Sequence, residues 1–295
     1  MNWRINLICG AIIFTLFGCS EDSVNVTGTS TEPNTLANAS SSSLSDITSS
    51  SEEMSSSSDN THSPILCKAH FGQPCGGVTE GDLWTFLDEE NANTDVYADS
   101  TWPSNAIADG KWYWITDSAY GGKTSIKWPI DPGDAQDKES LIPIIEQCNG
   151  LCGRILFDKG NSDYDPFVNL GFGIAKDSAG NRLAVDVSNW NGICIAYSSS
   201  ISIKLELDLG DSLTDLLQHD TPRKQLPKSV DGTEKCVPWS EFEREGWGPK
   251  IDGWDDNEII GEKAAQQLVG IIIILQGMDN LEGNFNIAGL GTYRD

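Results

Sequence analysis

The segment Pro166–Leu209 constrains the fold most strongly, because apolar and polar residues alternate along it in short runs separated by turn residues. In Ile201–Leu209 every second residue is Ile or Leu, which indicates a β-strand with one buried face. The opposite face, predicted to meet water or a ligand, carries Ser202, Lys204, Glu206 and Asp208. Further runs of strand type are Phe167–Ile174, Leu183–Val187 and Ile193–Tyr197. Because a half-apolar sheet must cover another sheet, the segment predicts an all-β protein with two antiparallel sheets packed face to face.

Several motifs in and around this segment follow one another in an order that resembles a known family. They are LWTFLDEEN at Leu83–Asn91, GKWYWITDSAYGGKTS at Gly110–Ser125, GFG at Gly171–Gly173, VDVSNWNGI at Val185–Ile193, KCVPWSEF at Lys235–Phe242, the apolar Leu268–Leu275 and GNFNI at Gly283–Ile287. This order resembles the galactose-binding-like β-jelly rolls, in particular modules similar to the family 11 carbohydrate-binding modules of bacteria that degrade plant cell walls. The resemblance covers Leu83–Tyr293 and implies that residues 64–295 form one carbohydrate-binding-like β-sandwich.

The N-terminus has the features of a bacterial export signal. Arg4 precedes the apolar run Leu7–Phe17, which is too short to span a bilayer as a mature helix. The run ends in Leu-Phe-Gly-Cys, which resembles a lipobox, so residues 1–19 are predicted to be a lipoprotein signal peptide with Cys19 as the lipidated residue. The alternative is an ordinary secretory signal with a coincidental cysteine. Either signal exports the protein, and the lipoprotein signal predicts an anchor in the outer membrane or at the cell surface.

Residues 20–63 form a segment that is too polar to build a core. Of these 44 residues, 22 are Ser or Thr, seven are acidic, and none is Lys, Arg or aromatic. Such a composition buries too little apolar surface to offset the entropy of ordering the chain. We expect a disordered tether that holds residues 64–295 away from a membrane, with a mean reach of about 35 Å.

The net charge of the predicted domain limits its partners. Residues 64–295 carry 37 acidic and 18 basic side chains, a net charge of −19. A field of this sign repels nucleic acid and acidic polysaccharides. Neutral ligands and divalent cations remain possible partners.

Six cysteines within residues 64–295 predict disulfides, since their number is even and the protein is exported. Six cysteines allow fifteen pairings. We expect neighbours to pair, with Cys67–Cys75 and Cys148–Cys152 closing small loops and Cys194–Cys236 joining two strands. The C-x7-C and C-x3-C spacings and only three histidines argue against zinc.

The aromatic residues are the best candidates for ligand contact, because indole and phenol rings stack on the faces of sugar rings. Most of the tryptophans are expected to fill the sandwich, and a period-two pair such as Trp112 and Trp114 is typical of a core. The candidates on turns rich in Pro, Gly and Ser are Trp102, Tyr120, Trp247 and Trp254, and Trp112 is retained with them. These five residues are the predicted carbohydrate-binding set.

The family resemblance also implies a structural calcium ion, held by acidic residues of the opening strand and of the last one. The sequence departs from that pattern, with Thr85-Phe86-Leu87 where Asp-Phe-Glu is expected and Asn286 in the last strand. Oxygen ligands that calcium accepts are present nearby at Asp88, Glu90 and Asn91. A solvated acidic turn explains these three residues equally well.

No sequence motif indicates catalysis. The G-x-S-x-G elbow, the H-E-x-x-H helix and the Gly-rich phosphate loops are absent from the sequence. Two carboxylates suffice for glycoside hydrolysis, but so many acidic residues single out no pair. We therefore predict binding of neutral plant polysaccharides of β-glucan type without turnover. A structural or adhesive surface protein is the first alternative, and a hydrolase or lyase is the second. Short helices are predicted at Ser212–Gln218 and Glu262–Gln267.

Overall fold

A computed structural model describes residues 82–85, 96, 98–132, 141–257 and 259–293 of the chain. The predicted signal peptide, Cys19, the tether, the Cys67–Cys75 pair and the calcium ligands Asp88, Glu90 and Asn91 lie outside these residues and stay predictions. Within the described ranges, no helix is both long and apolar enough to cross a membrane.

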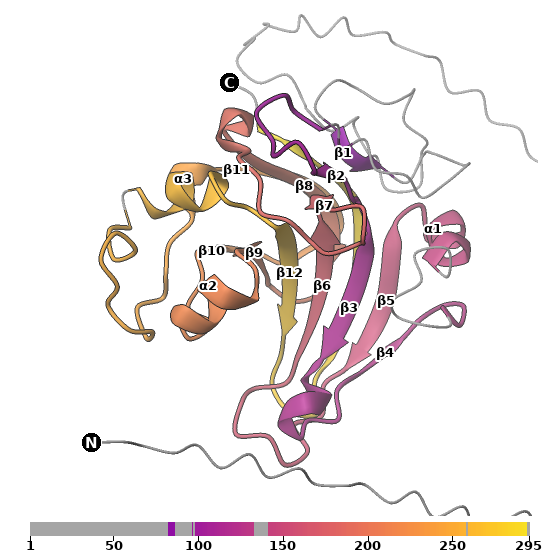
Figure 1. Ribbon diagram of the computed structural model, residues 1–295. Coiled ribbons are helices and arrows are strands. Elements are labelled where there is room, and N and C mark those ends of the chain that lie inside the picture. The colour runs from indigo at the N-terminus through magenta and orange to yellow at the C-terminus, as the bar shows by residue number, and fades with distance from the viewer. Residues whose placement is uncertain (1–81, 86–95, 97, 133–140, 258, 294–295) are drawn as a thin grey trace, which may run out of the picture. The chain divides into compact units, whose positions relative to one another are not determined.

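The described strands form two large antiparallel sheets and one small one (Figure 1). The five-stranded sheet has the order β10 (Arg223–Leu226), β9 (Ile203–Asp208), β12 (Gly270–Gln276), β6 (Phe167–Gly173) and β3 (Trp112–Thr116). The six-stranded sheet has the order β11 (Ser229–Pro238), β8 (Gly192–Ser199), β13 (Glu282–Thr292), β5 (Leu151–Leu156) and β4 (Ser125–Lys127), and β1 (Asp82–Thr85) also pairs with β13. The short β2 (Ile107–Ala108) and β7 (Ala175–Lys176) pair with each other. The chain passes repeatedly from one large sheet to the other, which is the connectivity of a jelly roll, so the predicted fold class is confirmed.

The core lies between the two large sheets, as the alternation in the sequence predicts. Leu205 on β9, Phe172 on β6 and Ile273 on β12 are fully buried from one side. Ile195 on β8 and Ile287 on β13 are fully buried from the other. Residues one position along each strand therefore belong to the outer faces of the sandwich.

Three of the four predicted strand runs in Pro166–Leu209 are confirmed as β6, β8 and β9. The predicted strand at Leu183–Val187 is wrong, because this run forms only one isolated bridge, between Val185 and Leu268. Val185 exchanges backbone hydrogen bonds with Leu268, and the Val187 N–H donates to the carbonyl of Ala265. Both valines are buried. An irregular segment that runs antiparallel beside the residues before β12 can thus show the same alternation of apolar and polar residues as a strand.

Three short α-helices lie among the described residues. Two match the predictions with shifted ends, namely α2 (Asp211–Leu216) and α3 (Ile260–Ala265). The sequence prediction missed α1 (Ile142–Cys148), which has a proline in its first turn and ends at Asn149 in the left-handed conformation. Single 3-10 turns occur at Asp117–Tyr120, Ser188–Trp190 and Trp239–Glu241.

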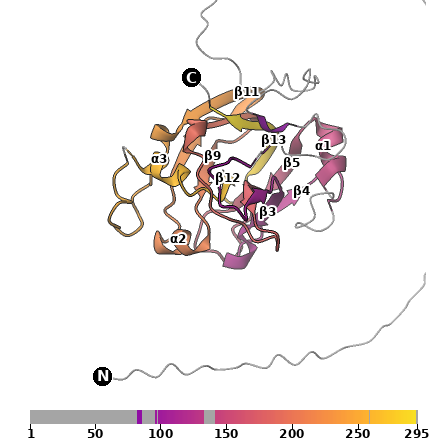
Figure 2. The same ribbon diagram turned by 45° about the horizontal axis from the view of Figure 1, so that its top comes forward.

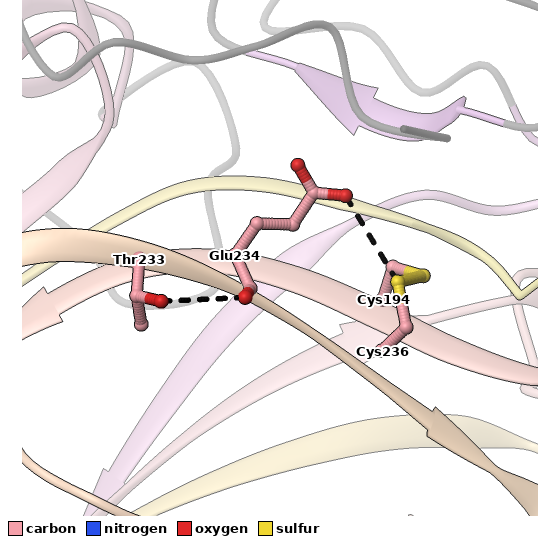
Figure 3. Close-up of a disulfide and its surroundings, with 4 residues drawn as sticks. All are labelled: Cys194, Thr233, Glu234 and Cys236. Carbon is pink, nitrogen blue, oxygen red and sulfur yellow. Dashed lines mark hydrogen bonds between the residues drawn. A yellow bond between two sulfur atoms is a disulfide. The ribbon is translucent and has the colours of Figure 1, made fainter. Parts of the chain in front are cut away.

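Two of the predicted disulfides fall within the described residues, and both are present. Cys148–Cys152 joins the end of α1 to β5. Cys194–Cys236 joins directly opposed positions of β8 and β11. Figure 3 shows that the Glu234 carboxylate points toward this bond, and its oxygen lies 3.9 Å from the sulfur of Cys236. These three residues are grouped like metal ligands, but the disulfide occupies both sulfurs.

Candidate functional site

The outer face of the five-stranded sheet carries an unusual set of side chains. One register row across the sheet consists of Arg223, Glu206, Ile272, Gly171 and Tyr113. Charged and aromatic groups therefore lie side by side over a sheet whose inner face is apolar. The sequence prediction that Glu206 and Asp208 point away from the core is confirmed, although both lie beneath other protein groups instead of facing open water.

The GFG motif of β6 creates a floor of bare backbone on this face. Phe172 points into the core, while Gly171 and Gly173 belong to the outer face. A Cβ atom on Gly171 would lie 1.9 Å from Cζ of Tyr113, and a Cβ atom on Gly173 would lie 2.2 Å from Oδ2 of Asp109. The Tyr113 ring and the Asp109 carboxylate thus rest on the sheet at positions that only glycine leaves open.

Two ion pairs fix the polar groups around this floor. The guanidinium of Arg182 donates to Oδ2 of Asp208 at 2.6 Å and to the Tyr113 hydroxyl at 2.8 Å. The Tyr113 hydroxyl in turn donates to the same Asp208 oxygen. Beside them, Nζ of Lys176 lies 2.8 Å from Oδ1 of Asp109. Burial raises the pKa of Tyr113 well above its usual value, and the Asp208 charge adds to this shift, so the phenol keeps its proton.

A cavity with a volume of about 660 Å³ opens over these groups. We call it the Tyr113 hollow. Its lining includes Asp109, Lys111, Tyr113, Ile115, Lys176 and Arg182, together with the 177–180 turn. Apolar and charged side chains therefore surround one space of the size that binds small ligands.

The half of the same face over β9 and β10 is covered. Arg223 pairs with Glu206 at 2.8 Å, and only 12% of the Glu206 side chain is exposed. Arg223 also donates to the carbonyl of His219, while Glu245 pairs with Lys204 at 2.7 Å. In Figures 1 and 2, α2 and the loop after β11 lie on this side of the sheet. The half over β12, β6 and β3 is the half that a ligand can reach.

Burial raises the pKa of Glu206 from 4.5 to about 7, against the opposing charge of Arg223. The folded state therefore binds a proton that the unfolded state has lost between these two pH values. This contribution to stability is complete below about pH 4.5 and is lost as the pH rises through about 7. From pH 4.5 to 8, the free energy of unfolding should fall by about 3 kcal/mol more in the wild type than in Glu206→Gln. Urea denaturation across this range measures the difference, and parallel pH profiles would contradict the assignment.

Asp220, whose side chain is fully buried, binds the backbone of the loop that carries Trp247. The Asp220 carboxylate accepts hydrogen bonds at 3.0 Å from the backbone N–H groups of Glu245, Gly246 and Gly248. The buried guanidinium of Arg244 lies 3.3 Å from it and also donates to the carbonyls of Pro249 and Trp254. A charged network thus fixes the loop, while the Trp247 side chain is 55% exposed.

A second group of exposed rings lies where β6 begins. Tyr120 and Tyr164 meet edge to face, with ring centroids 5.5 Å apart, and Tyr120 lies 6.0 Å from Phe167. Tyr120 is 49% exposed and Tyr164 is 61% exposed. We call Tyr120, Tyr164 and Phe167 the tyrosine platform.

The tyrosine platform also rests on a fully buried aspartate, Asp117. Its carboxylate accepts hydrogen bonds from the hydroxyl and backbone N–H of Thr124 and from the backbone N–H of Phe167. Gly122 passes so close that a Cβ atom there would lie 2.1 Å from Cγ of Asp117. The loops that present the platform are therefore fixed before any ligand arrives.

Three of the five predicted carbohydrate-binding residues are buried, so the expectation that they face a ligand is wrong. Trp102 is 7% exposed and donates its indole N–H to the carbonyl of Asp186. Trp112 lies in the core between Trp84 and Phe172. Trp254 is 6% exposed, with Nζ of Lys263 4.7 Å from its ring. Trp102 and Trp254 contact residues outside their own turns, and Trp112 faces the core from β3.

Tyr120 and Trp247 are exposed, as predicted, but they lie in different places. Trp247 belongs to the loop beside β9 and β10, and Tyr120 to the tyrosine platform. Tyr113, Asp109, Arg182 and Tyr164 were not among the predicted site residues. Period-two alternation in β3 was the signal for Tyr113, since it places that ring opposite the buried Trp112.

Comparison with known proteins gives distant likenesses. No protein-family model matches the chain. The chain is 25% identical over 206 residues to Endoglucanase 3 of Fibrobacter succinogenes, and the match covers 69% of this chain but 28% of the length of that protein.

Among solved structures, the chain is similar to the family 11 carbohydrate-binding module of a cellulosomal cellulase of Clostridium thermocellum. The TM-score is 0.32 with 9% identity, covering 74% of this chain and 97% of the module. A family 11 module of the same organism, in complex with a β-1,3-1,4-mixed-linked tetrasaccharide, gives 0.31 with 12% identity over 69% of this chain and 96% of the module. At these scores the likenesses carry no argument about function.

Proposed function

We propose that the outer face of the five-stranded sheet binds a neutral plant polysaccharide of β-glucan type without cleaving it. The observation that supports this most is the Tyr113 hollow, where a floor of glycine backbone holds an aromatic ring beside two fixed ion pairs. This arrangement lies on the outer face of the sheet, so packing of the core does not explain it. It matches the demands of a sugar ring, which presents an apolar face and a rim of hydroxyl groups.

The hollow offers both kinds of hydrogen-bonding partner to those hydroxyls. Of the groups that line it, Asp109 accepts hydrogen bonds, while Lys176 and Arg182 donate them. Because each cation already pairs with a carboxylate, the groups are positioned without a ligand and little side-chain entropy is lost on binding. The surface charge of residues 64–295 favours an uncharged glycan over an acidic one.

The similarity to part of an endoglucanase supports the choice of β-glucan. Binding without turnover is favoured by the state of the carboxylates on this face. Asp109 and Asp208 each pair with a cation, and a carboxylate that is held in this way is poorly placed to attack a sugar carbon. Glu206 lies beneath Arg223 on the covered half of the face, where its carboxyl group is out of reach of a glycosidic bond in the hollow.

Affinity electrophoresis through gels that contain barley β-glucan, hydroxyethylcellulose, xyloglucan or xylan tests the proposal. We expect retardation by at least one β-glucan and its loss in Tyr113→Ala. Val230→Ala, an exposed position on β11 of the other sheet, is the matched control and should migrate like the wild type. Unchanged mobility of the wild type in every gel would overturn the proposal in favour of a structural or adhesive protein. Release of reducing ends from a retained polysaccharide would favour the hydrolase.

Display at a bacterial surface completes the proposed function. The lipobox-like sequence before Cys19 and the Ser- and Thr-rich tether support an acylated N-terminus that holds the domain away from the membrane. Metabolic labelling with an alkyne-tagged palmitate should mark the wild-type protein and leave Cys19→Ala unmarked. Equal labelling of both proteins, or of neither, would argue against the anchor.

A further inference from the structure

On the open half of the sheet face, the groups that could contact a ligand lie in a line along β6. Along β6 the outward positions are Gly173, Gly171, Asn169 and Phe167, in a line. The Tyr113 hollow lies over the glycine end of this line, and the tyrosine platform begins with Phe167 at the other end. Six residues of strand separate these ends, which corresponds to about 20 Å. That length accommodates several sugar rings in a row.

Across the strands, in contrast, other side chains block the path that a ligand would take from the hollow toward β10. From the hollow toward β10, the face is occupied by the Glu206–Arg223 pair and by Glu245, which bridges to Lys204. Trp247 donates its indole N–H to Glu245 and so stands on the far side of this barrier. A chain that left the hollow in that direction would have to displace buried, paired charges.

The route along the strands is lined with groups that suit a glycan. Ile115 and Ile274 flank Asn169 on the neighbouring strands β3 and β12 and provide apolar contact. The side-chain oxygen of Asn169 is buried and has no hydrogen-bond partner among the described residues. A buried acceptor without a partner is costly, and a turn of the Asn169 side chain toward the surface would let a sugar hydroxyl between the two isoleucines satisfy it. At the end of the route, Tyr120 and Tyr164 present rings on loops fixed by Asp117.

We infer that the bound glycan runs along β6 and β3, from the Tyr113 hollow to the tyrosine platform, and that the protein therefore selects extended, unbranched chains over single sugars. This inference rests on the proposed function and specifies its ligand. Short oligosaccharides fill only the hollow. Longer ones also reach Tyr120 and Tyr164 and gain affinity from them.

Isothermal titration with the series from cellobiose to cellohexaose, and with mixed-linkage glucan oligosaccharides of the same lengths, tests the inference. In the wild type, affinity should rise with chain length. In Tyr120→Ala/Tyr164→Ala the affinity for the shortest bound ligand should stay the same, while the longest should bind about tenfold more weakly than to the wild type. The matched control Trp247→Ala should keep the full rise. Thermal denaturation verifies folding, and Tyr164→Ala alone replaces the double variant if that one unfolds.

The outcomes separate the two proposals. If Trp247→Ala removes the rise with length and the tyrosine variant does not, the chain runs across the strands and the inference fails while the proposed function stands. If neither variant alters the rise, the inference fails in the same way. If no oligosaccharide of either series binds to the wild type and no polysaccharide retards it, the proposed function fails and the inference fails with it.

Discussion

Replacing Asp220 by alanine should lower the free energy of unfolding by about 3–5 kcal/mol. The Asp220 side chain is fully buried, and it is the acceptor for the backbone N–H groups of Glu245, Gly246 and Gly248. Its removal leaves these donors without a partner and takes away one of the two carboxylates that pair with the buried guanidinium of Arg244, leaving only the more exposed Asp255. Unpaired buried donors and charges are among the most destabilising defects known in proteins.

Urea denaturation of the wild type, Asp220→Ala and Asp220→Asn measures this effect. Asp215→Ala, an exposed carboxylate on the nearby α2, is the matched control and should change stability by less than about 0.5 kcal/mol. Asp220→Asn keeps one acceptor oxygen and should lie between the wild type and the alanine variant. A loss in Asp220→Ala no larger than that of the control would contradict the role assigned to this residue.

Gly171→Ala should remove glycan binding as completely as Tyr113→Ala does. The Gly171 backbone has an ordinary strand conformation, so alanine introduces no backbone strain. The new methyl group would instead occupy the space of the Tyr113 ring, 1.9 Å from Cζ, and the ring would have to leave the sheet. Its hydrogen bonds with Arg182 and Asp208 would break with that movement. Overpacking of this kind should also lower stability by about 1–3 kcal/mol.

The double variant Gly171→Ala/Tyr113→Ala distinguishes overlap from any other effect of the added methyl group. Because removal of the ring relieves the overlap, the double variant should be more stable than the sum of the two single changes predicts. It should still fail to bind glycan. Additive losses of stability, or retained binding by Gly171→Ala, would show that the ring does not rest on Gly171.

The sequence predicts the sandwich well because its strands alternate strictly. Ile201–Leu209 places Leu205 and Leu207 in the core, and β9 is found there. The same rule fails at Leu183–Val187, because a segment bridged only at Val185 can bury every second side chain without a sheet. Alternation reports which side chains are buried and does not report the hydrogen-bond pattern.

The site was harder to predict because its parts come from separate strands and loops. The GFG motif was visible in β6, but the ring and the carboxylate that rest on it come from β3 and the residue after β2. Trp102 and Trp254 lie in turns whose local sequence suggests exposure, yet both are buried and contact Asp186 and Lys263, which lie outside those turns. Exposure of a loop aromatic depends on such distant contacts, which no local pattern contains.

The most direct test of the account is a nitrogen-15 NMR titration of residues 64–295 with cellohexaose and with a mixed-linkage glucan oligosaccharide of the same length. We predict that amide shifts concentrate on Tyr113, Ile115, Asn169, Gly171 and the turn from Lys176 to Arg182, and that the six-stranded sheet stays unaffected. Shifts confined to β11, β8 and β13, or no shifts at millimolar concentrations of either ligand, would contradict a glycan site on the outer face of the five-stranded sheet.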